Sequence, residues 1–303
     1  MSAFLLGCAM KTLNLIDANH FGMWSASSGN VIGFYLNKLS ELKQDFPGEL
    51  IMLWDGSSWR YGAYCAYKAN RKNLDERLQR QKDNWIQHKK RVATACHLLG
   101  IRQIVADNYE ADDLAAMLCR KTKGKAKVNL FTADRDWLQL YEKDRVRWID
   151  YKESIIVQDE DMFEVTTKGF KTQKQFISAK ALSGDVGDNI PSVGDFGVKT
   201  ALELFANFTT VEDAINATLY DKERVSKCSK RLRVFLDDVN KQGIYYRNLG
   251  LVDLNSSIIP APENLRVING SASPKDFALF NARHAIVSHD KVQSYMRSFG
   301  EDK

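Results

Sequence analysis

The 303 residues are enough for one large domain or two modest ones with real hydrophobic cores. Hydrophobic residues make up 44% of the chain and charged residues 27%, a balance that excludes a largely disordered protein. The formal net charge is only +5, but basic residues concentrate in 68–127 and 222–233, which is typical of a protein with a nucleic-acid partner.

The start of the chain has no features of a targeting signal or membrane anchor. Phe4-Leu5-Leu6 follows no basic stretch, and the apolar run is too short to span a bilayer. Met10 directly precedes the first expected strand, so we expect residues 1–9 to form a tail and Met10 to be an alternative start. Five scattered cysteines without a C-x-x-C pair indicate reduced thiols in a cytosolic protein.

Residues 11–157 alternate strand-like apolar runs with helical patterns. In chain order, the predicted strands are Thr12–Ile16, Glu49–Trp54, Ile101–Val105 and Val128–Phe131. Apolar positions at helical spacing predict helices over 30–42, 83–99 and 111–119. This alternation predicts an α/β fold, a mostly parallel sheet with helices on both faces.

The pattern changes at about Asp159, after which short helical segments are separated by turns and few good strands appear. We therefore divide the chain into an α/β core over 1–158 and a helical region over 159–303. No internal repeat, heptad run or low-complexity segment is present.

Acidic residues recur in five clusters, each near the end of an apolar run or in the first turn of a predicted helix. They are Asp17, Asp55, Glu110, Asp112, Asp113, Asp134, Asp136, Asp185 and Asp188. Strand ends of a parallel sheet meet at one edge, and carboxylates gathered there repel one another unless cations neutralise them. Divalent cations prefer oxygen ligands, and a pair about 4 Å apart can cleave a phosphodiester. The clusters predict a two-metal phosphodiesterase.

Each cluster taken alone has a structural explanation. Asp17 and Asp55 fit turn or capping positions, and the carboxylates of 110–113 fit the N-terminus of a helix. Asp185 and Asp188 lie in a glycine-rich segment whose dipeptides are typical of turns. The number of clusters favours a metal site, although a helix cap or turn remains an alternative explanation for each cluster taken alone.

Aromatic and basic residues interleave over 57–72, unlike the rest of the predicted core. One interpretation is a surface helix with its aromatic side chains packed below it. The other is a flexible gate in which Lys68 and Arg71 clamp phosphate while Tyr67 and the neighbouring tyrosines stack on bases.

Residues 193–204 are predicted to form a tight turn that opens a helix with Lys199 and Thr200 in its first residues. Backbone amides at such a turn can hold a DNA phosphate without reading bases. The five histidines show no ligand spacing, and no Ser-His-Asp order, P-loop or Rossmann glycine pattern is present.

Seven segments together resemble the 5′ nuclease family: the 5′–3′ exonuclease domain of bacterial DNA polymerase I, phage 5′ exonucleases and flap endonucleases. In family order, they are Leu15-Ile-Asp-Ala-Asn19, Trp54-Asp-Gly56, Tyr67-Lys-Ala-Asn-Arg71, Glu110-Ala-Asp-Asp113, Thr132-Ala-Asp-Arg-Asp136, Gly184-Asp-Val-Gly-Asp-Asn-Ile-Pro191 and Gly197-Val-Lys-Thr-Ala201. The length, with no polymerase domain attached, is similar to that of a stand-alone phage enzyme.

The resemblance implies a PIN-like 5′ nuclease core, a helical arch within 57–82 and a helix–hairpin–helix-type element within 184–206. It implies hydrolysis of DNA as a 5′–3′ exonuclease and flap endonuclease in replication or repair, with two or more Mg²⁺ or Mn²⁺ ions and no small-molecule cofactor. The implied partner is DNA with 5′ ends, flaps or nicks, in the cytoplasm of a bacterium or a phage-infected host.

The resemblance also implies a role for each matching residue. Asp17, Asp55, Glu110 and Asp112 would bind the first metal, Asp134, Asp136 and Asp185 the second, and Asp113 and Asp188 would bridge or act through water. Lys68 and Arg71 would neutralise the scissile phosphate, with Tyr67 and Lys72 beside them on the DNA. Ser192, Gly197, Lys199 and Thr200 would contact duplex DNA, with K⁺ on the hairpin carbonyls.

The hairpin departs from the family in one residue, because Asp195 stands where a glycine is usual. A carboxylate there tolerates fewer backbone conformations and repels phosphate. Two other functions remain open: a PIN-type ribonuclease and a non-catalytic DNA-binding protein. The Asp185/Asp188 segment and the hairpin disfavour the first, and the complete acidic set disfavours the second.

Overall fold

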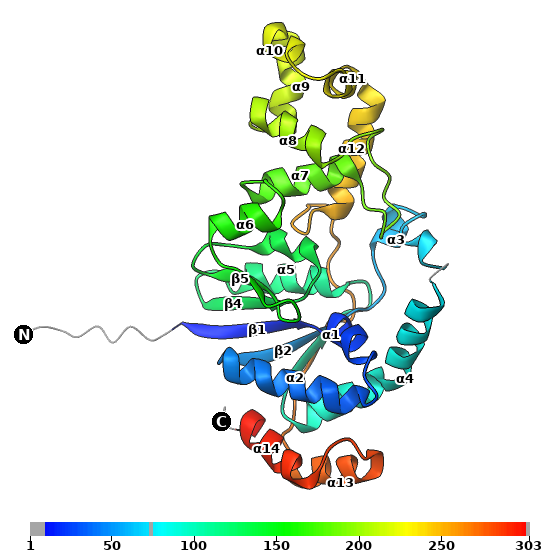
Figure 1. The fold of residues 1–303 in the computed structure, drawn as a ribbon, viewed down its shortest axis with the longest axis vertical. Coiled ribbons are helices and arrows are strands. Elements are labelled where there is room, and N and C mark those ends of the chain that lie inside the picture. Colours follow the sequence, from blue (N-terminus) through cyan, green and yellow to red (C-terminus); the bar gives the residue numbers. More distant parts are fainter. Residues whose placement is uncertain (1–9, 73–74, 301–303) are drawn as a thin grey trace, which may run out of the picture.

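The computed structural model describes residues 10–72 and 75–300, so the expected tail over 1–9 lies outside the described residues. A twisted sheet with helices on both faces occupies one part of the molecule, and a helical region extends from it (Figure 1). The strands are β1 (Lys11–Asp17), β2 (Glu49–Trp54), β3 (Arg102–Val105), β4 (Ala126–Phe131), β5 (Val146–Asp150), β6 (Ile155–Val157) and β7 (Arg266–Ile268).

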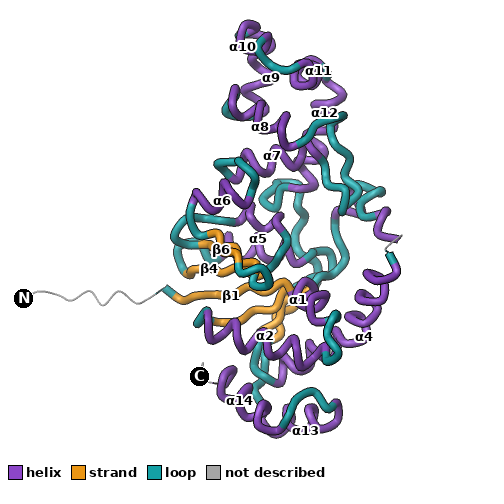
Figure 2. The backbone as a smooth tube through the Cα atoms, viewed as in Figure 1, coloured by secondary structure: helices purple, strands orange, loops and turns teal. Residues whose placement is uncertain are grey.

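The described strands form one sheet in the order β6-β5-β4-β1-β2-β3-β7. The central five strands pair in parallel, while β6 and β7 pair antiparallel at the two edges. The sheet stands out in orange between the purple helices (Figure 2). The predicted fold class and all four predicted strands are confirmed, and the carboxyl ends of β1, β2 and β4 meet at one edge, since parallel strands all run toward it.

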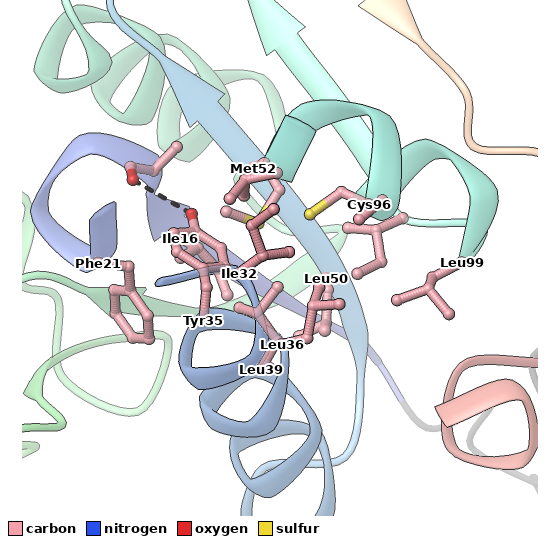
Figure 3. Close-up of a cluster of buried hydrophobic side chains, with 14 of the residues drawn as sticks. Ile16, Phe21, Ile32, Tyr35, Leu36, Leu39, Leu50, Met52, Cys96 and Leu99 are labelled. Atoms are coloured by element: carbon pink, nitrogen blue, oxygen red, sulfur yellow. Dashed lines mark hydrogen bonds between the residues drawn. The ribbon is translucent and has the colours of Figure 1, made fainter. Parts of the chain in front are cut away.

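One face of the sheet is covered by α1 (Ala18–Ser25), α2 (Val31–Asp45) and α4 (Glu76–Leu98). Side chains alternate along a strand, so Ile16, Leu50 and Met52 face this layer while their chain neighbours face the other. Figure 3 shows this core, in which the buried Tyr35 hydroxyl donates to the Ala18 carbonyl at 3.1 Å.

The other face packs on α5 (Ala111–Lys121), the short 3₁₀ helix η2 (Arg135–Leu140) and α6 (Glu160–Thr166). Leu13, Leu15 and Leu53 point into this second core, and Trp137 is fully buried there. Both faces of the central strands are therefore buried, which explains why they are apolar almost throughout.

The helical region has a core of its own. It contains α7 (Gln173–Ser183), α8 (Val198–Asn207), α9 (Val211–Tyr220), α10 (Lys222–Ser226), α11 (Lys230–Asp237) and α12 (Val239–Val252). α7 contacts η2 and packs along α12, so this region is attached where the sheet's acidic edge lies (Figure 1).

The chain returns to the α/β core after α12, a difference from the division at residue 158. β7 pairs with β3, and α13 (Pro274–His284) and α14 (His289–Gly300) pack on α4 and α2. Phe277, Val292 and Tyr295 are buried in the same cluster as α2. β7 has only three residues, all exposed, so hydrophobic alternation could not reveal it, and backbone pairing with the edge of β3 defines it.

Two short helices lie between β2 and α4 in the described residues. α3 (Arg60–Ala63) and the 3₁₀ helix η1 (Ala69–Lys72) precede α4, which begins seven residues before the predicted start because Asp75 caps it by accepting from Leu78 N at 2.8 Å. In the described part of the chain, no helix combines the length and apolar character needed to cross a membrane.

Candidate metal and nucleic-acid site

Asp17 and Asp134 stand at adjacent strand ends. Asp17 ends β1 and caps α1, with Oδ1 accepting from His20 N at 2.9 Å. Its Oδ2 accepts from Thr132, the residue after β4, at 3.0 Å, and the Thr132 hydroxyl in turn accepts from Asp134 N. Asp134 caps η2 by accepting from Asp136 N at 2.9 Å. The predicted capping role of Asp17 is therefore confirmed, and Asp134 caps η2 in the same way, so capping also orients both carboxylates at the edge.

Asp55 follows β2 and is fixed on both of its oxygens. Oδ1 accepts from Ala111 N at 2.7 Å, at the start of α5, and Oδ2 accepts from Asn19 Nδ2 at 2.5 Å. Asn19 is oriented by Trp85 of α4, whose indole donates to it at 3.0 Å. The next residue, Gly56, passes so close to the Ala106 carbonyl that a Cβ would lie 2.0 Å from its oxygen. Glycine is required there for β2 to deliver Asp55.

The three carboxylates at the start of α5 point in different directions. Asp112 accepts from the Trp137 indole at 2.7 Å. Both oxygens of Asp113 instead accept from Arg60 at 3.0 Å, and one also accepts from Glu110 N in a capping box. The Asp113 side chain is 0% exposed, so this geometry places it in a buried structural ion pair, although it was predicted as a metal ligand.

The loop after α7 brings Asp185 and Asp188 to the same place. Gly184 takes a left-handed φ of +71°, and a Cβ on it would lie 2.5 Å from the Ile190 carbonyl oxygen. Asp185 then pairs with Ile190 through two backbone hydrogen bonds of 2.8 Å, which closes the loop. The Gly-Asp-Val-Gly-Asp-Asn sequence therefore sets a compact turn that a residue with a side chain at 184 could not form.

One small cavity joins these elements. Its volume is about 10 Å³, and its lining includes Asp112, Asp136, Asp185 and Asp188 beside Arg60 and Tyr67. The sequence-predicted acids of α5, η2 and the 184–191 loop thus converge. Within residues 10–72 and 75–300, no three His, Cys, Asp or Glu side chains are already arranged to hold a metal ion.

Several of these carboxylates form ion pairs with basic side chains, so their oxygens are not free to face a common metal. Lys180 of α7 contacts Asp136 and lies 2.8 Å from Asp185. Lys68 contacts Glu110, and Arg71 lies 2.7 Å from Asp188. We call Glu110, Asp136, Asp185 and Asp188 the paired carboxylates. We call Asp17, Asp55, Asp112 and Asp134 the open carboxylates, since none of them forms an ion pair with a described residue.

The pKa values of Asp17 and Asp112 are raised, whereas those of Glu110 and Asp185 are lowered. Burial and the Asp55 charge raise the pKa of Asp17 to about 7. Burial and three neighbouring carboxylates also raise the pKa of Asp112 well above its usual range. Burial opposes ionisation of Glu110 and Asp185, but Lys68 with Arg60 lowers the pKa of the first and Lys180 that of the second. The open carboxylates lack a cation that the paired ones already have.

Asp134 follows the open set in its raised pKa, whereas Asp136 deviates from the paired set. The pKa of Asp134 rises to about 7 through surrounding protein atoms and Asp136, although its side chain remains exposed and solvent screens part of the shift. The pKa of Asp136 is raised by burial despite its contact with Lys180. The negative charge at the edge is therefore only partly balanced by the protein.

Arg60 and Lys180 were not identified from the sequence as parts of this site. Arg60 is 3% exposed, and its Nε donates to the Leu251 carbonyl of α12 at 2.8 Å, so it ties the start of α5 to the helical region. Lys180 lies four positions before Gly184 in the segment Ala179-Lys-Ala-Leu-Ser183. A lysine so close before an acidic turn was the available signal.

The segment over 57–72 lies against the acidic site. Lys68 has a left-handed φ of +55°, unusual for a lysine, and its N–H donates to the Asp188 carbonyl at 2.9 Å. Arg71 Nε donates to the Gly187 carbonyl at 3.2 Å, and Asn189 Nδ2 donates to the Ala66 carbonyl at 2.7 Å. Backbone strain of this kind persists only where the surroundings hold it. The predicted gate residues therefore contact the 184–191 loop.

The position of Tyr67 differs from the one expected for a ring that stacks on DNA bases. The side chain is 3% exposed, and its hydroxyl lies 2.9 Å from oxygens of both Glu110 and Asp188. Lys68 Nζ lies 4.8 Å from the Tyr67 ring centroid and the Tyr61 ring centroid lies 5.4 Å away, so the buried ring presents no free face to a base. Tyr61 is exposed, and Lys72 is the last residue of η1.

The predicted hairpin leads into α8, whose N-cap is Gly197. Lys199 is exposed and Thr200 is buried. Gly194 carries the left-handed φ of +66°, so the turn forms without a positive φ at Asp195. The Ser192 carbonyl accepts from Gly194 N at 3.0 Å, and the Ser192 hydroxyl donates to the Gly194 carbonyl.

A larger cavity of about 720 Å³ lies at the opposite end of the sheet, lined in part by Lys11, Glu49 and Arg102. Its carboxylate, Glu49, is paired with both Lys11 and Arg102. This cavity therefore offers none of the unbalanced acidic charge found at the carboxyl edge.

Comparison with known proteins identifies relatives. Residues 18–171, more than half of the chain, match the family model described as the 5′-3′ exonuclease, N-terminal resolvase-like domain. DNA polymerase I of Thermus filiformis is 31% identical over 69% of this chain, which spans 24% of that polymerase. A 5′-3′ exonuclease of Halalkalibacterium halodurans is 32% identical over 64% of this chain and 63% of its own length. The chain spans about a quarter of its polymerase relatives.

Solved structures show the same fold over almost the whole chain. The 5′-exonuclease of phage T5 with bound zinc ions has a TM-score of 0.69 at 22% identity, over 96% of this chain and 99% of that one. The catalytic core of Rad2 with a DNA substrate has a TM-score of 0.58 at 15% identity, over 96% and 92% of the two chains. With its parallel sheet, its acidic carboxyl edge and this match, the chain belongs to the 5′-3′ exonuclease family through its N-terminal resolvase-like domain.

Proposed function

We propose that the protein is a divalent-metal-dependent 5′ nuclease that hydrolyses DNA as a 5′–3′ exonuclease and a structure-specific flap endonuclease. The observation that carries this proposal is the set of open carboxylates, which gather negative charge at one edge without a protein cation. Burial and carboxylate repulsion raise the pKa values of Asp17 and Asp112, and the positive charge of a bound metal would offset both effects. Family membership and the phage T5 structure with metal ions support the same function.

The donor atoms fit Mg²⁺ or Mn²⁺. All are carboxylate oxygens, the ligands that hard divalent cations prefer. The open carboxylates would hold one ion, and Asp136 with Asp185 would hold another once Lys180 releases them. We assign Asp113 to the structural pair with Arg60 and place Glu110 and Asp188 at the margin, where they orient Lys68 and Arg71. When bound, two such ions activate water and stabilise the leaving oxygen of a phosphodiester.

The protein's own groups would position the substrate. Lys68 and Arg71 pair with Glu110 and Asp188 in this structure. Each side chain could leave its carboxylate and pair with a scissile phosphate instead. Exposed Lys199 at the start of α8 would contact a duplex phosphate without reading bases. The Rad2 core is known with a DNA substrate, which supports DNA as the polymer.

A K⁺ ion on the hairpin carbonyls belongs to the same proposal. The carbonyls of Ser192 and Gly194 each accept one hydrogen bond within the turn and keep a second lone pair that could face a cation. We do not extend the proposal to RNA, since Asp185, Asp188 and the hairpin were the features that disfavoured a small ribonuclease.

The decisive experiment compares 5′-labelled flap, nicked duplex and RNA substrates with Mg²⁺ and with EDTA. We expect cleavage of the flap and of the nicked strand from its 5′ end in Mg²⁺ only. Cleavage that persists in EDTA would rule out the metal mechanism, and preferential cleavage of RNA would favour the ribonuclease alternative.

A further inference from the structure

Lys180 makes one half of the acidic site different from the other. Its Nζ contacts Asp136 and lies 2.8 Å from Asp185, while its side chain is only 17% exposed. Among the described residues, no comparable cation pairs with Asp17, Asp55 or Asp112. Lys89 of α4 approaches that side, but its Nζ lies over the Trp54 ring, 5.4 Å from the ring centroid, and forms no ion pair with any residue that the structure describes.

The backbone that carries Lys180 is immobilised by packing. Ala181 and Leu182 on the same helix are fully buried in the core of the helical region. The Ala181 carbonyl also accepts from Asn248 of α12 at 2.9 Å. α7 therefore keeps the Lys180 Cα in place, and only the flexible four-carbon side chain can move its charge.

A divalent ion that uses Asp136 and Asp185 needs the oxygens that Lys180 now contacts. Two cations held by the same carboxylate within a few ångström repel each other strongly in a partly buried site. The ion must therefore displace Lys180, whereas an ion at the open carboxylates meets no such competitor.

We propose, on the basis of the proposed metal-dependent function, that Lys180 is a built-in competitor for the divalent ion at Asp136 and Asp185. This half of the site then fills after the open carboxylates, and more readily when a DNA phosphate draws Lys180 away. The displaced ammonium group needs another anion within reach of its side chain. A backbone phosphate at the site supplies that anion, so substrate and the second ion bind cooperatively.

This role separates Lys180 from an ordinary structural ion pair. If the ion pair were only structural, breaking it would lower the stability of the protein and have no other effect. A competitor also lowers the affinity for the ion that replaces it, so removing its charge improves metal binding even as it weakens the metal-free fold.

The test is Mn²⁺ binding to the metal-free full-length chain, followed by the electron paramagnetic resonance signal of free Mn²⁺. We expect two steps in the wild type, with the second at least tenfold weaker. Lys180→Met should tighten the second step by about tenfold or more, since a full charge beside the ion is removed. Lys180→Arg retains the charge and should keep the separation, and Lys174→Met, an exposed site on the same helix, should behave as wild type.

A second titration repeats the Mn²⁺ measurement in the presence of a 5′-overhang duplex with phosphorothioate linkages. It should tighten the second Mn²⁺ step in the wild type and change it much less in Lys180→Met. An unchanged or weaker second step in Lys180→Met would overturn the inference while leaving the proposed function standing. If the wild type binds no Mn²⁺ at all, both the proposed function and this inference are wrong.

A measurement on the wild type covers the case in which Lys180→Met does not fold. Acetylation of Lys180 by an amine reagent, followed by mass spectrometry, should be slow in the metal-free protein because the amine is paired and largely covered. It should accelerate across the second Mn²⁺ step and not across the first. A rate that stays constant through both steps would contradict displacement.

Discussion

The open and the paired carboxylates are the same chemical group at the same edge of one sheet, but they differ in what balances their charge. Asp17, Asp55, Asp112 and Asp134 rely on neutral donors such as Asn19, Thr132 and Trp137. Glu110, Asp136, Asp185 and Asp188 contact Lys68, Lys180 or Arg71. Neutral donors orient a carboxylate without cancelling its charge, so the open set retains the demand for a cation.

The difference shows that a cluster of acids is not one uniform metal site. Asp113 gives the limiting case, since its pair with Arg60 is fully buried and links α5 to α12 through Leu251. Substitutions in the two sets should therefore have different consequences, from lost chemistry to lost stability.

The largest effect is expected for Asp55→Asn, in the open set. The amide keeps one oxygen to accept from Ala111 N but sets its NH₂ group against Asn19 Nδ2, so the variant loses one hydrogen bond as well as the charge that a metal needs. We expect turnover to fall by on the order of 10³-fold, the upper range for one lost electrostatic contact. Single-turnover cleavage of a 5′ flap in Mg²⁺ measures this, with DNA affinity in Ca²⁺ as the control. Normal turnover would contradict the division.

Asp113→Asn should instead lower stability. It leaves the buried Arg60 without its bidentate partner, which typically costs about 3–5 kcal/mol of unfolding free energy. Urea unfolding of the metal-free protein measures the loss, and cleavage per folded molecule should stay close to wild type. Stability within about 1 kcal/mol of wild type would show that the pair is weaker than its geometry indicates.

Lys68→Ala removes a cation that pairs with Glu110, one of the paired carboxylates. Because Lys68 can transfer from Glu110 to the scissile phosphate, its loss should slow the chemical step by about 10²-fold and weaken DNA binding far less. Pre-steady-state cleavage separates the two quantities. Arg71→Ala should act in the same direction, and Lys90→Ala on the exposed face of α4 serves as a control. A change in affinity alone would make the arch an ordinary basic surface.

The pH dependence of metal stabilisation sharpens the comparison further. The pKa of Asp17 is raised from its usual 3.8 to about 7, so the folded state binds more protons than the unfolded state between these values. Stability from this group is therefore present at low pH and lost as pH rises through about 7. The pKa values of the paired Glu110 and Asp185 are lowered, so the stability from these groups has the opposite dependence and is lost as pH falls.

Mg²⁺ should consequently raise the melting temperature more at pH 8 than at pH 5.5, where protons compete for the open carboxylates. At a concentration of about 100 times the dissociation constant, the gain approaches about 2.7 kcal/mol. Differential scanning calorimetry at both pH values, with Asp55→Asn as the reference variant, measures it. An equal gain at both pH values would argue against these groups as ligands.

The smallest effect is expected outside both sets. Lys199→Ala removes an exposed charge at the start of α8, so duplex affinity should fall and the salt slope should drop by about one phosphate contact. Turnover at saturating DNA should stay near normal. Binding isotherms across a series of salt concentrations test this, and an unchanged slope would remove the hairpin from the DNA-binding surface.

The sequence by itself determined the sheet and the membership of the acidic set. The strands β1 to β4 were predictable because buried parallel strands are apolar on both faces. Most of the acids were predictable because they follow such a strand or open a helix. The 184–191 turn was predictable because only glycine tolerates the conformation of residue 184 and the close approach there.

Only the tertiary structure decided which acid meets which partner. Arg60 meets Asp113, Lys180 meets Asp136, and Tyr67 lies buried against Glu110, across separations of 43 to 53 residues. β7 pairs with β3 from more than 160 residues away, and its short exposed strand carried no periodic signal. Local patterns encode strands and helices, but charge pairing depends on which long side chains the finished fold brings within reach.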